Sequence, residues 1–233
     1  MSVNRLQTIK PLLLADSAAT NVDVAALNRF AGVVVGIDCS KEVLVGMAQL
    51  AGRSFSLLAR VAPAGQLSEE HLNRLLDSGV DGLVLSECAG RSDIQRLDVM
   101  LQVAEASMGI ASNRIRLYAE FGGSAGGLLS AHTLAGSSKR LDALIFDGTA
   151  LATLVGCKEP TAETHERTAA PILAARAAVV LKASHAGIPA YEVLPTSCDN
   201  ETRTRQALAK SRDNGFASVG CHSIEQATFL SDV

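Results

Sequence analysis

The chain has 233 residues and is close to electrically neutral, with 21 Lys and Arg against 24 Asp and Glu and a formal net charge of −3. Apolar residues make up 48% of it, aromatic residues only 3%, and Trp is absent. The core is therefore aliphatic, and the charge gives no reason to expect a nucleic acid or a membrane as partner.

The cysteines and the apolar runs together indicate the compartment. Five cysteines are scattered along the chain without a C-x-x-C pair, which favours reduced thiols over a disulfide framework. The first apolar run, PLLLA, is too short for a signal peptide, and no run approaches the ~18 apolar residues that a membrane span needs. We expect a soluble cytoplasmic protein.

Short apolar runs alternate with helical segments along the whole chain. Eight runs each end in or near a polar or charged residue, which predicts strands at 11–16, 32–38, 56–60, 80–87, 114–120, 141–147, 188–194 and 216–222. Apolar spacing, Ser at helix starts and Gly at helix ends predict helices at 22–30, 41–50, 67–79, 92–109, 169–187 and 201–215. The polar segment 157–168 follows the sixth run, so we expect it to overhang the mouth of the fold.

Eight strand–helix units predict a (β/α)8 TIM barrel, with residues 1–233 as a single domain. An open doubly wound sheet would use the same alternation, but eight units in this length and the absence of G-x-G-x-x-G after the first strand favour the closed barrel. Barrels of this kind concentrate their chemistry at the C-terminal ends of the strands. The candidates there are Asp16, Asp38, Arg60, Glu87, Glu120, Asp147, Glu192 and His222.

Three stretches carry a family pattern: VDGLVLSECAGRSDIQRLDVML, RIRLYAE and GLLSAHTLAGSSKRLDALIFDGTALATLVG. They resemble the HpcH/HpaI aldolase and citrate lyase β-subunit superfamily, and HAGIPAYEV followed by NGFASVGCHSIEQ is similar to its closing segments. The resemblance covers most of the chain from about Arg60 onward. It implies a barrel, usually a homo-oligomer, that binds Mg²⁺ or Mn²⁺ and cleaves or forms a carbon–carbon bond. The implied substrates are α-keto acids and 3-hydroxy acids or their CoA thioesters.

The resemblance assigns roles to two residues and leaves a third displaced. Arg60 falls where the family binds a substrate carboxylate, and Glu120 falls on a metal-binding glutamate. The family's second metal carboxylate falls on Ala150, but Asp147 precedes it by three residues and could share a cation with Glu120. Arg60 and Glu120 are thus the catalytic candidates, and Glu120 and Asp147 the metal ligands. Arg60 could instead form a structural ion pair with Glu87 or Glu120.

Two further features could contact a substrate. The loop FGGSAGG, which holds Gly122 and Gly123, could present backbone N–H groups to an anion, although a plain strand-to-helix turn explains it as well. His222 reads either as a rim histidine or as a hydrogen-bond donor supporting the site. Asp16 and Asp38 read as helix caps or solvated rim residues.

Departures from the family pattern favour a competing hypothesis. Glu87 stands where the family has Lys, Ala150 where it has Asp, and the L-E-D motif after the second strand is missing. The alternative to a metal-dependent carbon–carbon lyase is therefore a catalytically impaired barrel that serves as a binding or assembly protein. A Schiff-base aldolase is excluded because no Lys ends a strand, and neither a Cys221 nucleophile nor a G-x-S-x-G hydrolase is supported.

Overall fold

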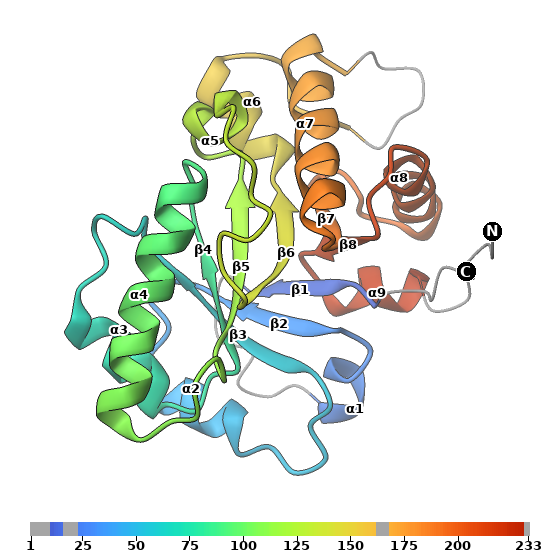
Figure 1. The fold of residues 1–233 in the computed structure, drawn as a ribbon. Coiled ribbons are helices and arrows are strands. Elements are labelled where there is room, and N and C mark those ends of the chain that lie inside the picture. The colour runs from blue at the N-terminus through green and yellow to red at the C-terminus, as the bar shows by residue number, and fades with distance from the viewer. Residues whose placement is uncertain (1–9, 16–22, 162–167, 231–233) are drawn as a thin grey trace, which may run out of the picture.

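Eight parallel strands, hydrogen-bonded in sequence order, close into a barrel with helices around it (Figure 1). The computed structural model describes residues 10–15, 23–161 and 168–230. The closing contact pairs β1 with β8, through Leu12 with Gly220 and Leu13 with Cys221. The predicted (β/α)8 TIM barrel is confirmed.

The strands are β1 Leu12–Ala15, β2 Gly32–Val35, β3 Ser56–Val61, β4 Gly82–Leu85, β5 Arg116–Phe121, β6 Leu141–Phe146, β7 Ala190–Val193 and β8 Ser218–Cys221. The helices are α1 Val24–Leu27, α2 Lys41–Ala48, α3 Glu69–Asp77, α4 Arg91–Met108, α5 Ala125–Leu129, α6 Gly148–Val155, α7 Ala170–Ala186, α8 Glu201–Asp213 and α9 Ile224–Leu230. Most strands are shorter than predicted, because the polar residue that ends a run turns into the following loop or caps the following helix.

The segment after β6 differs from its prediction. Asp147 starts helix α6 directly after the strand, so the polar segment that begins at Cys157 follows a helix rather than the strand itself. Part of that segment lies outside the described residues. The connection from β5 to β6 contains only the short helix α5, which lies with α6 beyond the strand end to which the β5 arrow points (Figure 1).

Alternate residues of each strand face opposite sides of the barrel wall, as the two-residue period of a strand requires. Leu58, Val84, Ile145 and Tyr191 belong to the cluster that fills the barrel interior, with Tyr118 packed against it. The intervening strand residues join a larger cluster with the helices. This alternation decides which side chains can reach the mouth, which lies at the C-terminal ends of the strands.

Helix ends carry the signals that the sequence predicted. Ser68 caps α3 by accepting a hydrogen bond from the His71 N–H at 3.2 Å. Gly109 and Gly187 end α4 and α7 in the left-handed conformation, with φ of 67° and 72°. Glycine adopts that conformation without steric cost, so both helices stop where predicted.

A buried ion cluster closes the opposite, N-terminal end of the barrel wall. Arg140, fully buried before β6, donates to Glu105 of α4 at 2.6 and 2.7 Å and to Asp98 at 2.8 Å. Glu105 also accepts from the backbone N–H groups of Asn113 and Ile115. Burial raises the pKa of Glu105, but these hydrogen bonds, led by Arg140, outweigh it and leave the pKa below its ordinary value.

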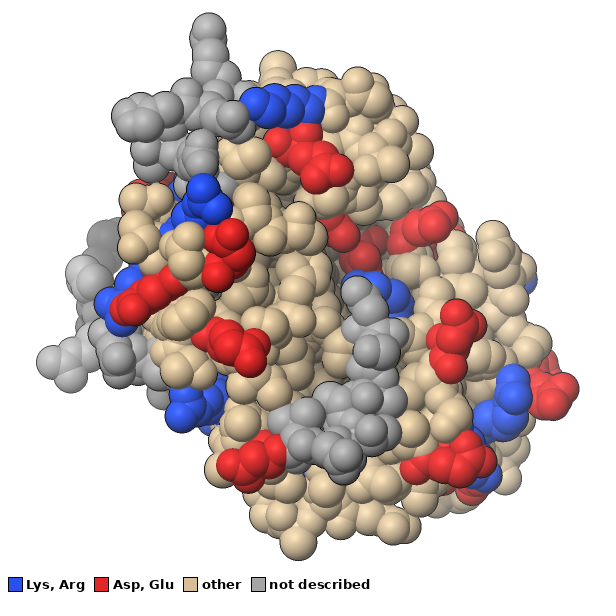
Figure 2. All heavy atoms as spheres, turned by 180° about the vertical axis from the view of Figure 1, so that it is seen from behind, with Lys and Arg blue, Asp and Glu red and all other residues tan. Residues whose placement is uncertain are grey.

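Within the described residues, no helix is both long and apolar enough to cross a lipid bilayer. On the face shown in Figure 2, acidic and basic side chains are interspersed rather than gathered into a field of one sign.

Candidate functional site

An ion pair between Arg60 and Glu120 lies at the barrel mouth. Arg60 follows Leu58 by two residues on β3, and Glu120 follows Tyr118 by two on β5, so both project to the interior side of the wall. Arg60 Nε lies 3.0 Å from Glu120 Oε2, and their side chains are 21% and 11% exposed. The structure thus brings together the two residues predicted as catalytic, and pairs them with each other.

Glu120 has a carboxyl group with a raised pKa. Burial is the largest cause; Arg60 opposes it, while the negative charges of Asp147 and Glu87 add to it. Burial disfavours the ionised form because a carboxylate loses its hydration there. A carboxyl group at a barrel mouth whose surroundings favour the protonated form is suited to exchange a proton or to bind a cation.

Asp147 lies at the end of β6, beside Glu120. It follows Ile145 by two residues, and its backbone N–H donates to the Phe121 carbonyl at 2.8 Å. Its Oδ1 accepts from the N–H groups of Thr149 and Ala150, both at 2.9 Å. One carboxylate oxygen therefore caps α6, while the charge still acts on Glu120.

The two glycines predicted to bind substrate are tightly packed against neighbouring residues. A Cβ on Gly122, whose φ is +136°, would lie 2.2 Å from the Asp147 carbonyl oxygen. A Cβ on Gly123 would lie 2.7 Å from Cγ of Glu87. Close packing against backbone and the positive φ therefore require glycine at Gly122, whereas a side chain in place of Gly123 would have to displace the side chain of Glu87.

His222 contacts the chain that follows β7. Its Nε2 lies 2.9 Å from the Leu194 carbonyl oxygen, and its backbone N–H donates to Gln226 Oε1 at 2.7 Å. Gln226 in turn donates to the Cys198 carbonyl at 2.8 Å. These contacts fix the β7–α8 segment and do not include Arg60 or Glu120, so the geometry favours the rim interpretation of His222.

Other acidic strand ends do not join the mouth. Glu192 lies between the interior residues Tyr191 and Val193, so it points outward, where Arg176 of α7 binds it at 2.8 Å. Its place among the mouth candidates was wrong, because the period of the strand turns it to the helix layer. Asp38 is an exposed rim residue and Ser40, not Asp38, caps α2. Asp16 lies outside the described residues.

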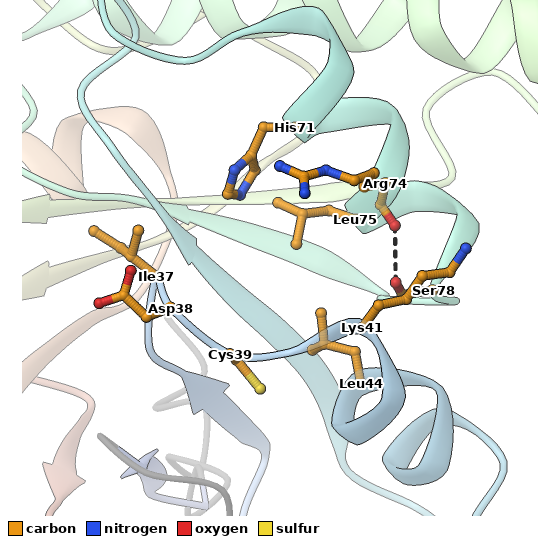
Figure 3. A pocket seen from close by; sticks show the side chains of 9 residues that line it. All are labelled: Ile37, Asp38, Cys39, Lys41, Leu44, His71, Arg74, Leu75 and Ser78. Atoms are coloured by element: carbon orange, nitrogen blue, oxygen red, sulfur yellow. Dashed lines mark hydrogen bonds between the residues drawn. The ribbon is translucent and has the colours of Figure 1, made fainter.

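A cavity of about 300 Å³ lies outside the barrel wall, between α3 and the chain that leads from β2 into α2. Figure 3 shows His71 and Arg74 of α3 extending over Leu75 toward that chain. Its lining is Ile37, Asp38, Cys39, Lys41, Leu44, His71, Arg74, Leu75 and Ser78. Its charges offset one another, since Lys41 pairs with Asp77 at 2.5 Å and Asp38 faces the same space as Arg74.

The mouth residues fit a divalent cation by their donor chemistry. Within the described ranges, no group of three or more His, Cys, Asp or Glu side chains is placed to hold a metal ion. Mg²⁺ keeps several waters and needs only one or two carboxylates. Glu120 and Asp147 are near enough for the charge of Asp147 to act on Glu120, and both offer hard oxygen donors. Arg60 competes with a cation for Glu120.

Two arginine clusters were not predicted from the sequence. Arg140 with Glu105 and Arg176 with Glu192 are buried pairs that join elements far apart in the chain. The position of Arg140 immediately before an apolar strand could have indicated that it is buried. The sequence spacing does not reveal its partner, Glu105, because the two residues lie in different elements. Both clusters lie in the helix layer or at the far end, and thus support the barrel rather than the mouth.

Comparison with known proteins identifies the family of the chain. The sequence profile described as HpcH/HpaI aldolase/citrate lyase matches residues 43–223. A comparison with curated protein sequences found no match.

Solved structures share the fold at low sequence identity. A Haloferax volcanii malate synthase in a magnesium/glyoxylate complex is 14% identical with a TM-score of 0.76, over 97% of this chain and 75% of that one. A citrate lyase of Burkholderia xenovorans LB400 is 11% identical, with a TM-score of 0.77 over 95% and 76%. Mycobacterium tuberculosis CitE, bound to the triphosphate group of ATP, is 15% identical with a TM-score of 0.68 over 97% of both chains.

Proposed function

Because the chain belongs to the HpcH/HpaI aldolase/citrate lyase family, we propose that it is a metal-dependent carbon–carbon lyase. Its substrate is a 3-hydroxy acid or the CoA thioester of one, and one product is an α-keto acid. The observation that carries the proposal is the grouping of Arg60, Glu120 and Asp147 at the strand ends where barrels perform catalysis. The malate synthase named above, which was solved with magnesium and glyoxylate, supports the ligand class.

Arg60 binds the carboxylate of the keto-acid portion. A guanidinium can hold a carboxylate through two parallel hydrogen bonds, which a Lys ammonium cannot do. In the structure Glu120 holds Arg60, so substrate binding requires Arg60 to exchange one carboxylate for another or to share both. Gly122, Gly123 and His222 remain our candidates for further substrate contacts around this position.

Glu120 and Asp147 are the residues that would hold Mg²⁺ or Mn²⁺. When bound, the ion stabilises the negative charge that develops on the substrate oxygen. Cleavage converts the hydroxyl-bearing carbon into a keto carbon: the hydroxyl proton leaves, the adjacent carbon–carbon bond breaks, and its electron pair goes to the departing enolate, which takes up a proton. Arg60 keeps the keto-acid portion in place during this change.

Calorimetric titration of the full chain with oxaloacetate, pyruvate and glyoxylate, with and without Mg²⁺, tests the proposal. We expect binding heat for at least one keto acid, and tighter binding when Mg²⁺ is present. Release of a keto acid from a malyl- or citramalyl-CoA substrate, followed by coupled reduction, gives the catalytic readout. Binding of neither metal nor keto acid, together with no release, would overturn the proposal.

The alternative is a barrel that has lost the chemistry and serves as a binding or assembly protein. The pairing of Arg60 with Glu120 favours it, because each of the two residues already has a partner of opposite charge without a ligand. So does the use of an Asp147 oxygen as a helix cap. Keto-acid binding without any cleavage would be its signature.

We also propose a cytoplasmic location, which the free thiols of the five cysteines support, and a homo-oligomeric assembly, which membership of the family supports.

A further inference from the structure

Glu87 adopts a backbone conformation that side-chain-bearing residues avoid. Its φ is +50°, and Asn113 is the other non-glycine residue with positive φ in the described part of the chain. Asn tolerates this region because its short side chain bonds locally, whereas Glu gains no such compensation. A strained residue that persists at a strand end points to a functional constraint on its position.

The neighbours of Glu87 hold it in this conformation. On one side, Ser86 donates to the Val61 carbonyl through its Oγ at 2.7 Å and through its N–H at 3.1 Å. On the other side, the N–H of Cys88 donates to the Glu120 carbonyl at 3.0 Å. Because both flanking residues are fixed to adjacent strands, the chain must turn sharply at Glu87.

The turn aims the Glu87 side chain at the mouth. Its Cγ lies so close to Gly123 that a Cβ there would approach to 2.7 Å. Gly123 follows Glu120 by three residues, so the Glu87 side chain packs against the loop that follows the strand carrying Glu120. Glu87 itself is exposed, and its charge reaches Glu120. The charges of Glu87 and Asp147 thus both act on Glu120, which is the ion-pair partner of Arg60.

We infer that Glu87 is a specificity-determining residue that selects a keto-acid portion with a single carboxylate. The inference rests on the proposed function. One substrate carboxylate is bound by Arg60, and a second would enter the field of Glu87 and lose affinity by like-charge repulsion. The substrate class is then a 3-hydroxy acid whose keto-acid product has one carboxylate, as pyruvate and glyoxylate do, and not a dicarboxylate such as oxaloacetate.

Calorimetry with pyruvate and oxaloacetate, both in the presence of Mg²⁺, tests this inference on the full chain. We expect the wild-type protein to bind pyruvate more tightly than oxaloacetate. In Glu87→Gln, which keeps size and hydrogen-bonding capacity, oxaloacetate should bind about three- to tenfold more tightly, while pyruvate changes less than about twofold. Glu69→Gln, an exposed carboxylate in the first turn of α3, is the matched control and should leave the preference unchanged.

Two outcomes separate the inference from the proposed function. If pyruvate binds but its preference over oxaloacetate is the same in Glu87→Gln, the inference fails and the proposed function stands. If no keto acid binds any variant, both fail.

Discussion

Arg60 and Glu120 face each other across the barrel mouth, with 3.0 Å between Nε and Oε2, although β4 separates their two strands. The pair is partly accessible, so a ligand can compete for either partner. It therefore sets the condition for any activity: an anion must displace Glu120 from Arg60, or a cation must displace Arg60 from Glu120.

Arg60→Lys should weaken keto-acid binding about tenfold or more, because a Lys ammonium cannot form the two parallel hydrogen bonds of a guanidinium. Calorimetry with pyruvate and Mg²⁺ measures the change. Arg74→Lys, in the cavity outside the barrel wall, is the matched control and should bind as the wild-type protein does. Equal affinity in Arg60→Lys would remove Arg60 from the substrate site.

Glu120 should make the protein less stable as pH rises. Burial raises the pKa of its carboxyl above the value in the unfolded chain, so the folded state binds more protons between those two values. The contribution favours folding below the ordinary carboxyl pKa and is lost as pH rises through the raised one. Urea unfolding of wild type and Glu120→Gln from pH 4 to 8 measures it: the stability difference should shift in favour of the variant as pH rises.

Glu225 should have the opposite effect on the pH dependence of stability, and so serves as a comparison for Glu120. Hydrogen bonds at the start of α9, first from its own backbone N–H and then from Ser223, lower the pKa of its carboxyl. Its contribution is therefore present at neutral pH and lost as pH falls, so Glu225→Gln should lose stability relative to wild type as pH rises. If the stability difference from wild type changed with pH in the same direction for both variants, burial would not explain the raised pKa of Glu120.

Glu87→Gly should stabilise the protein by about 0.5–1 kcal/mol, because glycine adopts the positive φ of this position without strain, less its greater freedom in the unfolded chain. Urea unfolding measures the gain. Asn113→Gly should change stability less, since Asn tolerates the same region. A loss of stability in Glu87→Gly would show that the Glu87 side chain supports the fold.

Gly122→Ala should destabilise the protein by about 2 kcal/mol or more, because its Cβ would meet the Asp147 carbonyl oxygen at 2.2 Å in a conformation with φ of +136°. Thermal unfolding measures this loss. Gly46→Ala, within α2, is the control: the added Cβ would meet no atom within 4 Å beyond its own helix backbone and chain neighbours, so the variant should be about 0.5–1 kcal/mol more stable.

Arg140→Met should cost about 3–5 kcal/mol, because it leaves the buried Glu105 carboxylate without its partner. The double variant Arg140→Met, Glu105→Gln should recover part of that loss, since the charge of the buried Glu105 is removed and only the more exposed Asp98 carboxylate lacks Arg140. Urea unfolding of both variants gives the comparison. A double variant less stable than the single one would mean that Glu105 serves mainly its backbone donors, Asn113 and Ile115.

The barrel could be predicted from the sequence because each strand and helix carries its own local signals. Ser68 and Gly109 stand at helix ends for reasons that are visible within a few residues. The direction of a side chain at a strand end was harder to predict, since it depends on which alternate residues of that strand face the barrel interior. Glu192 lies near the end of its apolar run, as the other candidates do, yet the position of Tyr191 in the interior turns it outward.

The site could be predicted only in part, because its contacts join distant segments. The sequence identified Arg60 and Glu120 as neighbours in function, and left open whether they pair with each other. The strain at Glu87 and the packing of Gly123 against it depend on hydrogen bonds from two adjacent strands. No spacing within one segment reveals such a turn.

The Arg140 cluster anchors the barrel at the end farthest from Arg60 and Glu120. Natural substitutions at the mouth therefore leave that anchor untouched, and a lineage can exchange one strand-end carboxylate for another while its barrel persists. Among relatives of this chain, substrate specificity should accordingly diverge before the fold does. An engineer who wishes to install a new reaction can alter the mouth and still rely on the far end to keep the scaffold intact.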